Sequence, residues 1–290
     1  MKKLRTRNHT VVLNRSKGGD AGITVFLVIL GLFMFLPMLY TVGQAFKPLN
    51  ELFYFPPRFL PEHPTFSNFS QLFYLMDYSW VPFSRYIFNT VLISVGGTFG
   101  NLVLCSLAAY ALAKIEFPGH KVIFQIIQKS LMYSPAVMAT LQFLVLRYLG
   151  WIDTYLAIII PACATPLGLY LMKQFMDTNV TTEILESARL DGAKEFRIFW
   201  SIAMPMVKPA WLTLIIYSFK DLWQLGSSNY IYSEQLKTIN YAIGQIGAAG
   251  ITRNGVAAAG AVFIMIVPIL VFVVSQSNVI ETMGSSGMKD

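Results

Sequence analysis

The sequence predicts an all-α membrane protein of about six transmembrane helices, because its composition and its apolar runs both fit a lipid environment. Of the 290 residues, 55% are hydrophobic and 13% are charged, whereas a soluble domain carries roughly 25% charged residues. The apolar runs are long enough for helices that cross a bilayer core about 30 Å thick. They lack the period-two alternation of strands, and a single span in lipid must satisfy its own backbone hydrogen bonds, as a helix does.

Apolar windows of suitable length occur at about six places along the chain. They cover residues 21–46, 85–113, 122–148, 154–176, 205–231 and 256–280. The first window follows a basic segment, but it exceeds the about 7 to 15 residues of a secretory signal core, so we expect a retained first helix. The predicted domain therefore covers residues 21–280, between tails at 1–20 and 281–290.

The positions of lysine and arginine predict how these helices are oriented. Basic residues are concentrated in the N-terminal tail, in the connection after the second window and in the connection after the fourth window. Because basic connections stay in the cytoplasm, both termini are expected there. The net charge of +7 then reflects contact with the membrane surface, and we expect no nucleic-acid binding.

The connection between the first two windows, residues 47–84, is rich in proline and aromatic residues. This composition suits an ordered cap on the outer side of the membrane. It suits equally well an aromatic belt at the lipid interface that has no partner. Both interpretations stay open from the sequence.

The connection between the fourth and fifth windows, residues 177–205, is both polar and periodic. Apolar residues recur near helical spacing from Ile184 to Phe199. This pattern predicts a short amphipathic helix outside the membrane. Thr181 or Thr182 is expected to cap its start.

Two residues are expected to shape the rest of this connection. Gly192 permits a sharp bend between two short helices, and Pro205 is expected to open the next span, where its missing N–H costs nothing. The amphipathic helix could lie among lipid headgroups or contact another protein. The small residues on it favour the protein contact, since they allow close approach: Ser187, Ala188, Gly192 and Ala193.

The same connection resembles a known family signature. It contains Glu186-Ser187-Ala188, then Asp191-Gly192-Ala193, then Ile202 and Pro205. This run resembles the EAA motif of ABC-importer permeases, with Ser in place of the middle Ala. Further segments resemble the maltose and glycerol-phosphate type of carbohydrate permease: FNTVLIS near Asn89, SLAAYALAK ending at Lys114, and LGWIDTYLAIIIP from Leu149.

The resemblance implies the ABC type I importer permease fold, with a cytoplasmic coupling helix between the fourth and fifth spans. In such permeases the EAA helix docks into a groove on a cytoplasmic ATPase subunit and transmits its closure to the membrane helices. The residues that would couple to the ATPase here are Glu186, Ser187, Ala188, Asp191, Gly192, Ala193 and Pro205.

The resemblance also implies a set of partners. They are a second permease subunit, with a heterodimer expected, two copies of a cytoplasmic ATPase, and an extracytoplasmic solute-binding protein. The substrate would be a sugar, with an oligosaccharide favoured. The assembly would lie in the bacterial cytoplasmic (inner) membrane.

The chain has no motif for chemistry of its own. No GxxxxGK[ST] loop is present, so ATP and Mg²⁺ are expected in the partner ATPase. The three histidines have no metal-ligand spacing, and Cys105 and Cys163 lie in apolar runs, where buried thiols are expected. We expect no catalytic site, cofactor or metal in this chain.

Polar residues in the fifth window form a candidate translocation pathway, because charged groups inside spans are expensive. They are Lys220, Asp221, Trp223, Gln224, Asn229 and Tyr230. Aromatic and amide groups suit sugar stacking and hydroxyl recognition, but the same groups could bond to the partner permease. Lys220 and Asp221 are adjacent, so they are expected to serve different partners.

Four prolines interrupt the third, fourth and sixth windows: Pro135, Pro161, Pro166 and Pro268. They are either hinges for alternating access or simple packing kinks.

The main alternative is an ion-coupled secondary transporter. Such a protein is expected to show internal repeats and acids near the membrane midplane. The sequence shows no convincing repeat, and Asp221 is the one candidate acid deep in a window. A membrane-bound enzyme, the second alternative, lacks a catalytic cluster.

Overall fold

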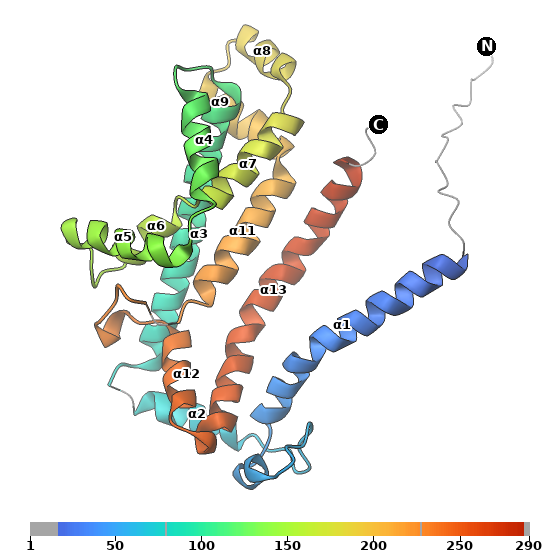
Figure 1. Ribbon diagram of the computed structural model, residues 1–290, viewed down its shortest axis with the longest axis vertical. Helices are drawn as coiled ribbons and strands as arrows, with labels where there is room; N and C mark the ends of the chain where they lie inside the picture. Colours follow the sequence, from blue (N-terminus) through green and yellow to red (C-terminus); the bar gives the residue numbers. More distant parts are fainter. Residues whose placement is uncertain (1–16, 79, 227, 287–290) are drawn as a thin grey trace.

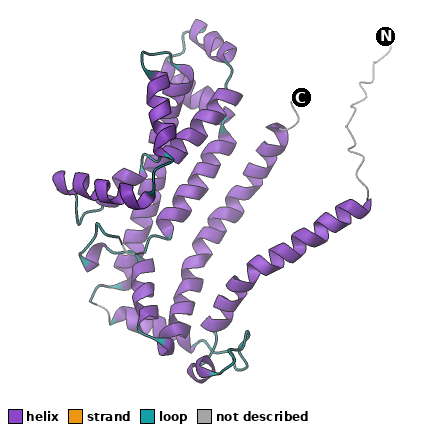
Figure 2. Ribbon diagram, in the orientation of Figure 1, coloured by secondary structure: helices purple, strands orange, loops and turns teal. Residues whose placement is uncertain are grey.

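A computed structural model describes residues 17–78, 80–226 and 228–286 of the chain. Within these ranges every regular element is helical, and loops connect the helices (Figure 2). The all-α fold class predicted from the sequence is therefore confirmed.

The helical elements follow one another along the chain from residue 17 to residue 286. In order they are α1 (Lys17–Ala45), η1 (Leu49–Phe53), α2 (Ser67–Asp77), α3 (Phe83–Lys114), α4 (His120–Ser130), α5 (Pro135–Tyr148), α6 (Leu156–Ala162), α7 (Pro166–Asn179), α8 (Thr182–Leu190), α9 (Glu195–Ile198), η2 (Phe199–Ala203), α10 (Met204–Met206), α11 (Lys208–Trp223), η3 (Glu234–Leu236), α12 (Ile239–Ala248), η4 (Ile251–Arg253) and α13 (Asn254–Ser286). The element η2 is a π-helix, and η1, η3 and η4 are 3₁₀-helices.

Four helical segments in the described part of the chain are long and apolar enough to cross a membrane. They are Gly18–Ala45, Phe83–Lys114, Leu156–Asn179 and Ile251–Ser275. A fifth candidate is a bent pair, in which Glu195–Met206 meets Lys208–Trp223 at 83°. The described residues thus supply four or five candidate spans where the sequence predicts about six.

The third predicted window, residues 122–148, is not one continuous span, so this prediction is wrong. The chain leaves the helical conformation after α4, and α5 runs sideways from the bundle (Figure 1). Ser134 has extended backbone angles, φ −63° and ψ 132°, because the ring of the following Pro135 disfavours helical angles there. At 11 and 14 residues, α4 and α5 are each shorter than the about 20 residues of a span.

The fifth predicted window is also corrected at both of its ends. Pro205 does not open the span, because it lies in α10, and Val207, with φ −104° and ψ 26°, separates α10 from α11. Pro209 instead occupies the first turn of α11, where a missing N–H is harmless. The helix then ends at Trp223, so the predicted span extends too far toward residue 231.

The elements form an elongated bundle with two distinct ends (Figure 1). α3 packs against α7 and α11, α13 packs against α11, and α1 contacts α13 near one end and diverges from it. We call the end that carries η1, α2 and α12 the cap end. The opposite end carries α8 and α9, and we call it the α8 end.

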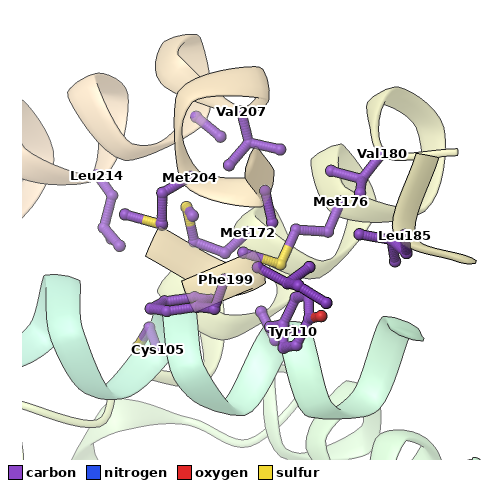
Figure 3. Packing of buried hydrophobic residues seen from close by; sticks show 14 of the residues in the cluster. Cys105, Tyr110, Met172, Met176, Val180, Leu185, Phe199, Met204, Val207 and Leu214 are labelled. Carbon is purple, nitrogen blue, oxygen red and sulfur yellow. The ribbon is translucent and has the colours of Figure 1, made fainter. Parts of the chain in front are cut away.

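Each end of the bundle has its own apolar core. The larger core lies toward the α8 end and joins side chains of α3, α7, α8 and α11, as Figure 3 shows. The smaller core lies toward the cap end and joins side chains of α2, α3, α12 and α13. Both cores include α3, which therefore connects the two ends of the molecule.

The connection between the first two spans folds into an ordered cap. Lys47 is buried, and its ammonium donates a hydrogen bond to the carbonyl of Arg58. The Glu51 carboxylate accepts the backbone amides of Glu62 and His63 at 3.0 and 2.9 Å. Burial lowers the pKa of Lys47, and the nearby Glu51 carboxylate opposes that shift. The cap is thus held by polar groups that are bonded within it.

Candidate functional site

The segment after α7 contains a short helix that ends in a sharp turn. Gly192 has φ 81°, a left-handed conformation that glycine adopts without steric cost. The amide of Ala193 donates to the carbonyl of Ala188, and that of Gly192 donates to Arg189, each at 3.0 Å. This is the hydrogen-bond pattern of a Schellman cap, so the predicted bend is confirmed. Thr181 precedes the helix as predicted, but its side chain makes no capping hydrogen bond.

One face of α8 is built into the protein. Leu185 and Ala188 are buried and belong to the larger core, together with Val180 and Phe199. Figure 3 places Leu185 beside Val180 and Met176. The small size of Ala188 is therefore used for packing within this chain.

The other face of α8 and the turn after it point into solvent. Leu190 is 89% exposed and Phe196 is 67% exposed. The remaining predicted coupling residues are exposed, except Ala193, which is half-buried: Glu186, Ser187, Asp191, Gly192 and Pro205. The turn thus presents two large apolar side chains that sequence reasoning did not single out, although their spacing on either side of Gly192 could have indicated them.

A carboxylate on the far side of the turn joins the segment to α3. Glu195 accepts a hydrogen bond from Arg189 Nε at 2.6 Å through Oε1, and one from the hydroxyl of Tyr110 at 2.8 Å through Oε2. This cluster was not predictable from the sequence, because Tyr110 is distant in the chain and the turn abolishes helical spacing between Arg189 and Glu195.

A polar cavity of about 580 Å³ lies between the end of α3 and α8. Lys114, Glu116 and His120 line one side of it, and Glu186 and Arg189 line the other. The exposed acid of the EAA-like run therefore faces a charged hollow.

Lys220 and Asp221 are close to each other but face different surroundings. Lys220 Nζ lies 3.8 Å from Asp221 Oδ1, and both side chains are exposed. Asp221 lines a cavity of about 430 Å³ with Thr165 and Ser218, whereas Lys220 lines one of about 600 Å³ with Asn240. Lys220 and Asp221 thus face different cavities, as expected for residues that serve different partners. Their charged groups also approach each other, which the sequence did not predict.

The other candidate pathway residues do not gather at one place. Trp223 is 8% exposed, its indole N–H donates to the carbonyl of Ile264 at 3.0 Å, and its ring stacks on Phe219 at 5.4 Å. It is therefore fixed against α13, although it forms part of the wall of the cavity of about 600 Å³. Gln224 follows directly and lines the same cavity.

Asn229 and Tyr230 lie in the loop beyond α11, outside the span in which the sequence placed them. Asn229 is exposed. The Tyr230 hydroxyl donates to the carbonyl of Ala139 at 3.3 Å, and its ring stacks on Phe143 at 6.4 Å. Tyr230 thus holds this loop against α5.

The cavity beside Asp221 is bordered by two breaks in the helices. Leu131 follows α4, and Thr165, with φ −82° and ψ 131°, separates α6 from α7. Asn101 on α3 donates through Nδ2 to Thr165 Oγ1 at 3.0 Å. Sequence reasoning missed Asn101 and Thr165, because isolated polar residues inside apolar windows give little signal.

The described residues contain no group of three or more His, Cys, Asp or Glu side chains that could hold a metal ion. Cys105 and Cys163 are both buried, as the sequence predicts.

No protein-family model matches the chain, but curated proteins of similar sequence include components of transport systems. Protein LplC of Bacillus subtilis (strain 168) is 31% identical over 218 residues, which are 73% of this chain and 70% of LplC. The galactooligosaccharides transport system permease protein GanQ of the same organism is 27% identical over 279 residues, 91% of this chain and 94% of GanQ. The inner membrane ABC transporter permease protein YcjP of Escherichia coli (strain K12) is 29% identical over 208 residues, 71% of each chain.

A solved structure shares the fold. A chain of a bacterial ABC transporter involved in the import of the acidic polysaccharide alginate superposes with a TM-score of 0.76 and 23% identity. The match covers 91% of this chain and 98% of that chain. It therefore extends over nearly all of the described bundle.

Proposed function

The chain belongs to the carbohydrate ABC transporter permeases, and from this premise we propose that it forms one half of the membrane channel of a binding-protein-dependent sugar importer. The observation that carries the proposal is the construction of α8. Leu185 and Ala188 anchor this helix in the larger core, while Glu186 and Leu190 face solvent. A helix that is rigidly held on one face and free on the other can transmit a rigid-body movement.

The partner of the exposed face is a cytoplasmic ATPase subunit, which binds ATP and Mg²⁺ and hydrolyses the ATP. Closure of the ATPase around α8 displaces the turn at Gly192. The displacement reaches α7 and α11 through the chain and through the shared core.

The second partner is another permease subunit. With four or five candidate spans among its described residues, this chain has too few helices to enclose a path for a sugar by itself. The cavities beside Asp221 and Lys220 are walls of such a path or contacts with the second subunit. Leu131 and Thr165 border the first of these cavities at helix breaks, which suits alternating access, since broken helices line the sites of many transporters.

The substrate is a saccharide, and an oligosaccharide is favoured because GanQ, which matches 94% of its length, is a galactooligosaccharide permease. An extracytoplasmic binding protein delivers the saccharide to the cap end. In this orientation the α8 end and both termini lie in the cytoplasm of a bacterial cell, and the chain lies in the cytoplasmic membrane.

A substitution at Gly192 tests the coupling role. A Cβ at this position would meet nothing within 4 Å, so the effect of Gly192→Val is backbone strain of about 1–2 kcal/mol, or roughly 5- to 30-fold in an equilibrium. We expect uptake of a labelled saccharide, chosen from a panel that the binding protein retains, to fall by a similar factor. Gly192→Asn is the matched control, because asparagine tolerates the left-handed conformation, and it should keep most of the uptake.

Two results would contradict the proposal. Normal uptake by Gly192→Val with normal ATPase assembly would remove the coupling role of the turn. Uptake that continues without the ATPase and stops with a proton ionophore would instead identify an ion-coupled transporter.

A further inference from the structure

We propose that Glu195 is a positioning residue that attaches the α8–α9 segment to α3, so that a displacement of α8 moves a third span besides α7 and α11. This inference rests on the proposed function, because it concerns how movement of the ATPase enters the membrane domain. The chain itself joins α8 to α7 and α11 only. The attachment to α3 is made entirely by side chains.

Besides the apolar contacts of the larger core, the polar part of this attachment passes through a single carboxylate. Oε1 of Glu195 accepts from Arg189 Nε at 2.6 Å, and Oε2 accepts from the Tyr110 hydroxyl at 2.8 Å. Arg189 lies in the last turn of α8, Glu195 begins α9, and Tyr110 lies one turn before the end of α3. The carboxylate thus bridges the two sides of the Gly192 turn and connects both to the span.

The phenol end of this bridge is fixed in place. Tyr110 is 4% exposed, and its ring packs edge-on against the buried Phe199 with centroids 5.4 Å apart. Figure 3 shows both rings between α3 and the chain that leads to α10. A buried tyrosine hydroxyl needs a hydrogen-bond partner, and Glu195 supplies it.

The hydrogen bonds of Glu195 fix the orientation of α8 and α9 more than they stabilise the fold. The ion pair of Arg189 and Glu195 is partly exposed, and such pairs contribute little to stability. The apolar contacts of Leu185 and Ala188 hold α8 to the core, but apolar attraction is non-directional. Charge-assisted hydrogen bonds are directional and short, so they fix how α8 and α9 are rotated relative to α3.

The test uses the complete transporter, with its partner permease, ATPase and binding protein, in liposomes. Spin labels at Leu104→Cys on α3 and Val273→Cys on α13 report the distance between these spans, without nucleotide and after trapping with ATP and vanadate. In the wild type we expect trapping to change this distance. In Tyr110→Phe and in Glu195→Gln we expect at most about half of that change in distance, because one hydrogen bond is worth roughly 2- to 10-fold in an equilibrium. ATP hydrolysis should stay within about twofold of wild type, and the thermal midpoint should be unchanged.

The control removes the same chemical group at the other end of α3. The buried Tyr86 donates its hydroxyl to Glu234 Oε1 at 2.8 Å near the cap end, and Tyr86→Phe should leave the nucleotide-dependent change intact. The double variant Tyr110→Phe with Glu195→Gln should be no worse than the poorer single variant, since both act through one bridge.

The possible failures are distinguishable. If the wild type shows the distance change and both single variants keep it in full, the bridge does not transmit movement. If both variants lose ATP hydrolysis and thermal stability together, Glu195 has only a structural role. If the wild type itself shows no change and binds no ATPase, it is the proposed function that fails.

Discussion

Asp153 shows how a single residue joins two loops that are distant in the sequence. Its carboxylate accepts the backbone amides of Tyr232 and Ser233 at 2.9 and 2.8 Å and also the hydroxyl of Ser233. Its own amide donates to the carbonyl of Tyr230 at 2.8 Å. Asp153 adopts φ 61°, which few residues other than glycine, asparagine and aspartate tolerate. The residue therefore joins the loop before α6 to the loop after α11.

The pKa of Asp153 predicts a dependence of stability on pH. The hydroxyl of Ser233, and then the backbone amides of Ser233 and Tyr232, lower this pKa, while burial opposes the shift. Because the folded pKa lies below the unfolded value of about 3.9, the stabilisation is present above that value and is lost as the pH falls through the folded pKa. Asp153→Asn keeps the backbone conformation but does not titrate, so it should unfold at a lower temperature than wild type at pH 7.

The measurement is thermal unfolding of the detergent-solubilised protein from pH 7 down to about pH 3. The difference in unfolding temperature between wild type and Asp153→Asn should narrow as the pH falls. A difference that stays constant would show that the charge of the carboxylate contributes nothing to stability.

Single residues were predictable from the sequence where their role is local. Gly192 was identified because a turn needs its left-handed conformation, and the buried thiols because they lie in apolar runs. Trp223 was assigned to the pathway on its side-chain type, yet its indole N–H is bonded to Ile264, a partner far away in the chain. Glu195 was missed for the same reason, since its partner Tyr110 lies on another helix.

The helical elements were predictable from apolar length, and their breaks were not. No proline interrupts α1, α3 or α13. Pro37 in α1 and Pro268 in α13 both lie inside continuous helices. Pro135 divides its window and Pro205 does not open a span, so a proline in an apolar run has no fixed outcome. Whether the helix continues depends on neighbours that can satisfy the freed backbone groups, and these are tertiary contacts.

The packing of α12 on α13 depends on a glycine. A Cβ at Gly260 would lie 2.8–2.9 Å from three side-chain carbons of Ile243, so Gly260→Ala should separate the two helices at a cost of about 1–3 kcal/mol. A Cβ at Gly244, in α12, would meet nothing within 4 Å. Gly244→Ala should therefore stabilise the protein by about 0.5–1 kcal/mol through helix propensity. Thermal unfolding in detergent measures both, and equal effects of the two substitutions would refute the close packing at Gly260.

The molecule has two ends of different character, the cap end and the α8 end, and α3 connects them. The ordered cap lies at one end with α2 and α12, and α8 with its exposed turn lies at the other (Figure 1). The positions of lysine and arginine predict that these two ends lie on opposite sides of the membrane, and the side of each end stays a prediction. The sequence could not give the shape of the path between the ends, because the cavities beside Lys220 and Asp221 need side chains from several elements.

The orientation of the two ends can be tested with introduced cysteines, since Cys105 and Cys163 are buried. Tyr54→Cys in the cap and Ser187→Cys on α8 both replace exposed residues. On intact cells, stripped of their outer layers where necessary, a membrane-impermeant maleimide should label Tyr54→Cys at once. It should label Ser187→Cys only after the membrane is permeabilised, and the reverse pattern would invert the proposed topology.

The 83° angle between the Glu195–Met206 segment and α11 has a mechanical consequence. If the ATPase pushes along that segment, as proposed, the force would act nearly crosswise to the axis of α11. It would then tilt this helix more than it would shift it along its own axis. Such a tilt would move the far end of α11 sideways, while the apolar segment in contact with acyl chains would keep about the same length. Under the proposed coupling, α11 would therefore tilt without moving charged groups such as Lys208 into hydrocarbon, where they are costly.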